Sequence, residues 1–232
     1  GYSNVAVEGN RLYTLGWKGE NYIVWCLNTD TGKAIWQYSF PRNWQDPQAT
    51  PTLEGDSVYA LSWEGIIVCL NSKNGKLRWK KDLVADYGAV RPYFGFAGSP
   101  AVEGDLLLLT ANTSGMALNK ETGQIVWGSE PPPKEMANMR GWGSYLTSGT
   151  DYSTPAIFTQ NNQRKALFSS YKGISSVNIA SGEPSWIYTW ESYGAGHGGD
   201  PAVSGSRILI TFDLKGDSPN PMIAPPMSVL LE

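Results

Sequence analysis

"CLNSKNGKLRW" at residues 69–79 is the clearest indication of the fold, because the chain contains this eleven-residue pattern four times. The other copies are CLNTDTGKAIW (26–36), ALNKETGQIVW (117–127) and a more divergent SVNIASGEPSW (176–186). Their final tryptophans are 43, 48 and 59 residues apart. A period of some tens of residues indicates a protein built from stacked copies of one structural unit.

A second pattern lies upstream of most copies and is typical of a hairpin. It reads VAVEGNRLY (5–13), PTLEGDSVY (51–59), PAVEGDLLL (100–108) and, near the end, PAVSGSRIL (201–209). The fourth unit has the longer PAIFTQNNQRKAL (155–167) in its place. Two separate patterns that recur with the same, slightly variable spacing establish that the repeat is real.

The second unit shows how each copy is expected to fold. Its pattern predicts four antiparallel strands at 50–54, 57–63, 66–70 and 76–83. Gly55-Asp56 is a two-residue hairpin signal. The alternation in 57–63 predicts a half-buried strand, whereas the apolar run 66–70 predicts a strand buried on both faces. In the last strand we expect Trp79 to face one side and the lysines the other.

Units of four strands at this spacing predict an all-β protein with one domain, a β-propeller. Its blades would cover about 1–45, 46–95, 96–150, 151–195 and, incompletely, 196–232. Helix is expected only in 131–140, where prolines can open one or two turns. The fifth unit has a third strand at 228–232 but no following glycine turn, tryptophan or outer strand. We therefore expect an open arc, the N-terminal part of a longer chain with about seven or eight blades.

Composition and motifs exclude several classes of function. The net charge is −3 without a lysine or arginine cluster, which argues against a nucleic-acid surface. No apolar run approaches the roughly 18 residues that a membrane helix needs. The chain has no CxxC, HExxH or GxSxG motif and a single histidine. We therefore predict no catalytic residue, no metal site and no cofactor.

Asparagine, glycine and tryptophan recur in every copy of the pattern. They are Asn28, Gly32, Trp36, Asn71, Gly75, Trp79, Asn119, Gly123, Trp127, Asn178, Gly182 and Trp186. We expect the asparagine and glycine to build a turn, since asparagine can bond its own backbone and glycine adopts positive φ. The tryptophans should fill the gaps between blades, with each indole N–H bonded to a nearby carbonyl.

The stretch Ala117-x-Asn119-x-x-Thr122-Gly123-x-x-x-Trp127 resembles the tryptophan-docking motif of the quinoprotein-like propellers, named for pyrroloquinoline quinone (PQQ). Asparagine stands where that family prefers aspartate, and two copies carry Asn74 and Ser181 in place of threonine. The resemblance covers essentially the whole chain and implies a periplasmic or secreted bacterial protein. That family includes PQQ-dependent alcohol dehydrogenases and the scaffold lipoprotein of outer-membrane barrel assembly.

The two cysteines, Cys26 and Cys69, occupy equivalent positions in successive units, where the family has alanine. Such positions should lie farther apart than the roughly 5.5 Å Cα separation of a disulfide, so we expect two buried, reduced thiols. The quinoprotein alcohol dehydrogenases resemble one another in having a disulfide between adjacent cysteines and calcium-binding side chains. This chain lacks the adjacent cysteines, and PQQ with calcium remains only an alternative cofactor.

The turns between second and third strands share one face with the loops that cross between blades. On this loop face, aromatic residues alternate with arginines, a combination suited to sugars, peptides or a planar carboxylated cofactor. The candidate ligand-binding residues are Trp17, Trp63, Arg91, Arg140, Trp142, Tyr171 and His197. Aromatic loop residues can equally pack on one another, and a lone loop histidine is more often structural.

Two functions remain open from the sequence. The first is a non-catalytic exported propeller that binds a protein, peptide or glycan at the loop face. The alternative is a PQQ-dependent alcohol or sugar oxidoreductase, or a degenerate remnant of one. The missing cofactor signatures favour the first.

Overall fold

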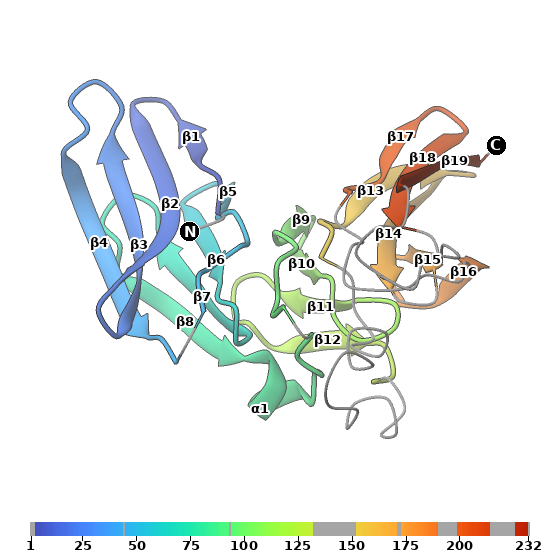
Figure 1. Ribbon diagram of the computed structural model, residues 1–232, viewed down its shortest axis with the longest axis horizontal. Helices are drawn as coiled ribbons and strands as arrows, with labels where there is room; N and C mark the ends of the chain where they lie inside the picture. Colours follow the sequence, from blue (N-terminus) through green and yellow to red (C-terminus); the bar gives the residue numbers. More distant parts are fainter. Residues whose placement is uncertain are drawn as a thin grey trace.

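The computed structural model describes residues 3–43, 45–92, 94–131, 152–170, 173–189, 199–213 and 226–231. These residues form five antiparallel sheets, four with four strands and one with three, in which strands adjacent in sequence pair with one another. Figure 1 shows the sheets following one another along an open arc, from the N-terminal sheet to the C-terminal one. The prediction of an all-β propeller of four-stranded blades is confirmed.

The blades have the following strands. Blade 1 contains β1 (Ala6–Glu8), β2 (Arg11–Lys18), β3 (Asn21–Asn28) and β4 (Ala34–Pro41). Blade 2 contains β5 (Thr52–Glu54), β6 (Ser57–Leu61), β7 (Ile66–Asn71) and β8 (Leu77–Asp82). Blade 3 contains β9 (Ala101–Glu103), β10 (Leu106–Leu109), β11 (Met116–Asn119) and β12 (Ile125–Gly128). Blade 4 contains β13 (Ala156–Gln160), β14 (Gln163–Ser170), β15 (Gly173–Asn178) and β16 (Pro184–Thr189), and blade 5 contains β17 (Ala202–Ser204), β18 (Arg207–Asp213) and β19 (Pro226–Leu231).

The core is divided into layers, one between each pair of neighbouring blades. In β6, Val58 and Ala60 pack toward blade 1, whereas Tyr59 and Leu61 pack toward blade 3. Every residue of β6 is therefore buried. The prediction that this strand would be half-buried is wrong, because its small and polar residues also face a neighbouring blade. The strand is also shorter than predicted, since Trp63 lies in the following turn.

The end of blade 2 contains a short helix that the sequence did not predict, α1 (Leu83–Tyr87). The Asp82 carboxylate accepts hydrogen bonds from the backbone N–H groups of Val84 and Ala85, so this N-cap ends β8 one residue early and starts the helix. Gly88 ends it in the left-handed conformation, with φ 67°. The expected helical segment 131–140 lies outside the described residues except for Pro131.

The outer strand β8 also corrects one detail of the expected pattern. Trp79 is buried and Lys80 is exposed on the opposite face, as predicted. Lys81, however, lies on the same side as Trp79, and its side chain approaches Gly123 of blade 3. Two residues along a strand return to the same face, so only one of the two lysines can point away from Trp79.

The recurring asparagine and glycine build the turn between third and fourth strands. Asn28 Oδ1 accepts hydrogen bonds from the backbone N–H groups of Asp30 (3.1 Å) and Thr31 (2.9 Å). Gly32 then adopts φ 66° and donates its N–H to Asn28 O at 2.8 Å. A side-chain oxygen at this position is what the turn requires, so asparagine serves as well as aspartate.

Each outer-strand tryptophan of blades 1 to 3 contacts the turn of the following blade. Trp36 Nε1 donates to Ser72 O at 2.9 Å, Trp79 Nε1 to Lys120 O at 2.9 Å, and Trp127 Nε1 to Ile179 O at 2.8 Å. Every acceptor is the residue directly after the turn asparagine. The indole also lies on the turn glycine, because a Cβ added to Gly75 would come within 2.6 Å of the Trp36 ring.

The two cysteines lie on third strands, Cys26 on β3 and Cys69 on β7, and both are free and buried. The prediction of two buried thiols is confirmed. Each is the cross-strand partner of an outer-strand tryptophan, Cys26 of Trp36 and Cys69 of Trp79. Burial raises the pKa of both thiols, that of Cys69 to about 11, which keeps them protonated and unreactive at neutral pH.

The innermost strands are joined by hydrogen bonds that the sequence analysis did not anticipate. At the head of each inner strand, a backbone N–H donates to the side-chain oxygen of the equivalent residue in the next blade. The bonds are Asn4 N to Thr50 Oγ1 (3.2 Å), Thr50 N to Ser99 Oγ (3.0 Å), Ser99 N to Thr154 Oγ1 (3.3 Å) and Thr154 N to Asp200 Oδ1 (2.6 Å). We call these five residues the inner relay, and it spans all five blades.

Candidate functional site

On the loop face, two tryptophans at equivalent positions each carry an arginine. Trp17 is the second-to-last residue of β2 and Trp63 follows β6, four residues after Tyr13 and Tyr59 respectively. The guanidinium carbon of Arg42 lies 4.0 Å from the centre of the Trp17 ring, and that of Arg91 lies 4.4 Å from the centre of the Trp63 ring. Both arginines come from crossing loops, so the first two blades place a cation over an aromatic ring in the same way.

The two tryptophans differ in what covers them. Trp63 is only 9% exposed, because a Cβ added to Gly95 would come within 2.3 Å of its ring. Its carbonyl also accepts the N–H of Phe96 at 3.0 Å. Trp17 is 43% exposed and carries Arg42. Of the two rings, Trp17 is the one that offers surface to a ligand, whereas Trp63 holds a crossing loop in place.

The arginine on the exposed ring has polar partners, whereas the arginine on the covered ring has none among the described residues. Arg42 Nε donates to Gln45 O at 3.0 Å, and its guanidinium forms an ion pair with Asp46 at 3.3 Å. Arg91 is exposed and stacks on Trp63 without a hydrogen bond to any residue that the structure describes. The Trp63 ring supports one face of the guanidinium, and because Arg91 is exposed its N–H donors remain accessible to solvent. A guanidinium matches a carboxylate with two parallel hydrogen bonds.

A partly buried polar network connects the first crossing loop to the turn after β6. Tyr22 Oη lies 2.7 Å from Gln45 O and 3.0 Å from Glu64 Oε1, and Asn43 N donates to the same carboxylate oxygen at 3.1 Å. Burial, followed by the Glu64 charge, raises the pKa of Tyr22 far above its usual value. The network therefore keeps Tyr22 protonated and fixes the loop that carries Arg42. Sequence reasoning missed it because its members come from two blades.

The remaining predicted ligand-binding residues lie outside the described residues. They are Arg140, Trp142, Tyr171 and His197. Of the seven predicted residues, the structure therefore places Trp17, Trp63 and Arg91, and brings Trp63 and Arg91 into contact.

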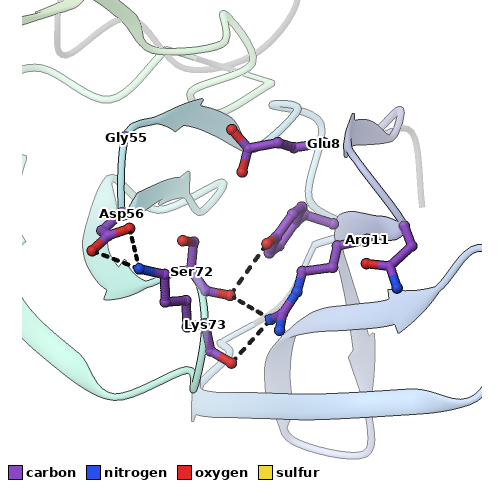
Figure 2. Close-up of a pocket in the computed structure, with 8 residues that line it drawn as sticks. Glu8, Arg11, Gly55, Asp56, Ser72 and Lys73 are labelled. Atoms are coloured by element: carbon purple, nitrogen blue, oxygen red, sulfur yellow. Dashed lines mark hydrogen bonds and ion pairs between the residues drawn. The ribbon is translucent and has the colours of Figure 1, made fainter.

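A pocket of about 550 Å³ lies on the opposite face, between blades 1 and 2. This hairpin face is formed by the turns that join first to second and third to fourth strands. The pocket is lined by Glu8, Asn10, Arg11, Tyr13, Gly55, Asp56, Ser72 and Lys73. Figure 2 shows that these side chains come from two hairpins and from the turn after β7. The sequence analysis treated all of these positions as structural turns and did not predict the pocket.

Most charged groups of this pocket already have partners. Lys73 Nζ lies 2.9 Å from Asp56 Oδ1, and the hydrogen bond from Lys73 holds the pKa of Asp56 below its usual value. Arg11 Nη1 donates to Ser72 O at 3.2 Å and to Lys73 O at 3.0 Å. Glu8 is exposed and makes no hydrogen bond or ion pair with any described residue (Figure 2).

No three His, Cys, Asp or Glu side chains in the described ranges gather as ligands for a metal ion. The two cysteines are single residues on separate blades, so they do not form the adjacent disulfide of the dehydrogenase branch. Within the same residues, no helix has the length and apolar character that crossing a membrane would require.

Comparison with known proteins gives the family. A family profile described as outer membrane protein assembly factor BamB matches residues 19–189. The outer membrane protein assembly factor BamB of Yersinia pestis is 28% identical over 130 residues, which are 53% of this chain and 30% of that protein. The chain therefore spans less than a third of the length of this curated relative.

Solved structures show the same fold. The crystal structure of BamB from Moraxella catarrhalis superposes with a TM-score of 0.58 and 17% identity, over 90% of this chain and 54% of that one. The quinohemoprotein alcohol dehydrogenase of Comamonas testosteroni superposes with a TM-score of 0.60 and 15% identity, over 98% of this chain and 39% of that one. The repeated blades, the contacts between them and the family match over residues 19–189 show that the chain belongs to the family of the outer membrane protein assembly factor BamB.

Proposed function

We propose that this chain is a non-catalytic, periplasmic binding scaffold that engages a polypeptide at its loop face during outer membrane protein assembly. The relatives that it matches are named for that assembly. The observation that carries the proposal is the Arg91–Trp63 contact, which supports on a nearly buried ring a guanidinium whose donors no described residue uses. A binding protein gains affinity when such a group is held in its bound orientation in advance.

The surroundings of Arg91 suit a polypeptide better than a small polar ligand. Phe94 is exposed and meets Tyr152 edge to face, with ring centres 6.1 Å apart. Trp17 adds a second exposed ring on the same face. Aromatic rings beside an arginine are the side chains that most often dominate the energy of protein interfaces. We infer that Arg91 holds a carboxylate or main-chain carbonyl while the rings contact apolar side chains.

The test uses a fluorescently labelled outer membrane porin, unfolded in urea and diluted into buffer, with binding followed by fluorescence anisotropy. Arg91→Gln should weaken binding roughly tenfold, as expected for the loss of a charge-assisted hydrogen bond. Arg91→Lys should recover little, because lysine lacks the planar fork. Lys33→Gln, an exposed lysine in the β3–β4 turn on the hairpin face, is the matched control and should bind like the natural chain.

Unchanged affinity in Arg91→Gln, or an equal loss in Lys33→Gln, would contradict the loop-face proposal. The oxidoreductase alternative is tested in parallel by adding PQQ with calcium and alcohols or sugars. We expect neither a rise in melting temperature nor reduction of a redox dye. Dye reduction that depends on PQQ would overturn the non-catalytic assignment.

A further inference from the structure

The pocket on the hairpin face exists because one position differs between blade interfaces. The residue after the turn asparagine lies between neighbouring blades at the three interfaces that join blades 1 to 4. Between blades 2 and 3 this residue is Lys120, whose side chain is only 14% exposed and whose ammonium lies 3.1 Å from Glu54 Oε1. Between blades 3 and 4 it is Ile179, which is 4% exposed and belongs to the core cluster. Long side chains fill both positions.

Between blades 1 and 2 the equivalent residue is Ser72. Its carbonyl accepts hydrogen bonds from Trp36 and Tyr13, just as the Lys120 carbonyl does from Trp79 and Tyr59. The backbone is therefore in the same place, but the side chain is too short to fill the gap. The cavity of about 550 Å³ is lined by Ser72 and Tyr13 at this position.

The carboxylate that would receive a cation is present at the first interface. Glu8 is the last residue of β1, as Glu54 is of β5 and Glu103 is of β9. Glu54 pairs with Lys120, and Glu103 pairs with Arg164 at 2.6 Å, in each case a cation from the following blade. Glu8 has no such partner among the described residues.

The two cations that line the pocket do not take this role. Lys73 Nζ is held by Asp56 at 2.9 Å, within its own blade. Arg11 directs its guanidinium to two backbone carbonyls, and Figure 2 shows the Glu8 carboxylate pointing away from it. The space beside Ser72 and the unpaired Glu8 thus reproduce the surroundings of the Lys120 side chain without its ammonium group.

We propose that this pocket binds a lysine side chain of a partner polypeptide, with its ammonium on Glu8 and its stem in the space that Lys120 fills at the next interface. The site lies on the face opposite to Arg91 and does not depend on the loop-face function. Because Glu8 is exposed, the ion pair is screened by solvent and the interaction is weak on its own. It would contribute specificity within a larger contact.

The test follows amide resonances of the ¹⁵N-labelled 232-residue chain during titration with Nα-acetyl-lysine N-methylamide. The norleucine analogue, with the same stem length but no ammonium, is the matched ligand control. We expect the lysine compound to shift the amides of Gly9 and Gly55, beside the pocket, along a saturable curve. Glu8→Gln should weaken this binding roughly fivefold, the effect of one exposed ion pair.

Two further variants locate the site. Ser72→Lys should abolish the shifts, because its own side chain would fill the pocket as Lys120 does. Glu54→Gln, at an interface that is already filled, should leave the titration unchanged. Equal shifts from the norleucine compound, no shift with the lysine compound, or persistent binding by Ser72→Lys would each overturn the proposal. None of these outcomes bears on porin binding at Arg91.

Discussion

The hairpin face and the loop face of this chain are built from the same strands but follow different rules. On the hairpin face, three successive interfaces repeat one bond, an indole N–H to the carbonyl after the turn asparagine, at 2.8–2.9 Å. On the loop face, equivalent positions carry an exposed Trp17, a covered Trp63 and a buried Asn112. The contact that repeats at each interface holds the blades together, whereas positions that vary from blade to blade are available for binding a ligand. We therefore expect mutations on the two faces to differ in stability cost.

The largest effect is expected for Trp79→Ala on the hairpin side. It removes a buried ring between blades 2 and 3 and leaves the Lys120 carbonyl with one donor fewer. The loss of unfolding free energy should be about 3–5 kcal/mol, as for other large core truncations. Urea denaturation followed by circular dichroism measures it. A loss below about 1 kcal/mol would show that these tryptophans do not hold the blades together.

Trp63→Ala tests whether the two faces differ at every position, because Trp63 is a loop-face residue that is buried like a core residue. Its ring lies between Gly95 and Arg91 and anchors the crossing loop. We expect a loss of about 3 kcal/mol, close to that of Trp79→Ala. The same denaturation experiment applies. A nearly unchanged stability would instead mark Trp63 as a residue kept for ligand binding.

The Glu103–Arg164 ion pair on the hairpin face gives a smaller, pH-dependent effect. The hydrogen bond from Arg164 lowers the pKa of Glu103 in the folded chain. Its stabilisation is therefore complete above the unfolded pKa of about 4.3 and is lost as pH falls through the lower folded value. Because the Arg164 side chain is largely exposed, the amount is at most about 1 kcal/mol. Arg164→Gln should remove this part of the acid dependence, which sets in as the pH falls below the unfolded pKa. An unaltered profile would contradict the assignment.

The smallest effect is expected for Trp17→Ala, the loop-face counterpart of Trp63. Its ring is largely exposed and its main contact is the guanidinium of Arg42. The change in unfolding free energy should be within about 0.5 kcal/mol, although porin binding should fall. A destabilisation as large as that of Trp63→Ala would erase the distinction between the two positions.

The blades could be predicted from the sequence because each is specified by residues close together in the chain. The turn asparagine and glycine and the outer-strand tryptophan occur in every copy. The structure places the asparagines at the ends of third strands, the glycines in the turns and the tryptophans within the fourth strands. The helix α1 was missed because a single residue, Asp82, decides it by capping, and its signal overlaps that of a strand. The full burial of β6 depends on two neighbouring blades, which no local pattern reports.

The candidate sites were harder to predict because they depend on contacts across interfaces. Trp17 and Trp63 look alike in sequence, and only Gly95, which lies 32 residues beyond Trp63, separates their roles. The hairpin-face pocket results from a side chain that is too short, Ser72 where another unit has Lys120. A signal was available there, since aligning the four copies places these two residues at one position.

The inner relay gives the arc a direction. Each link runs from the N–H of an earlier blade to a side-chain oxygen of the later blade, and no link runs the other way. A side-chain substitution in the inner relay therefore removes the hydrogen bond to one neighbouring blade and keeps the bond to the other. Replacing Thr50 with valine would remove the acceptor of Asn4 N–H, yet the bond from Thr50 N–H to Ser99 would survive because it uses the backbone of Thr50. Loss of a side-chain oxygen in the inner relay therefore removes a blade's bond to the preceding blade and leaves its bond to the following blade intact.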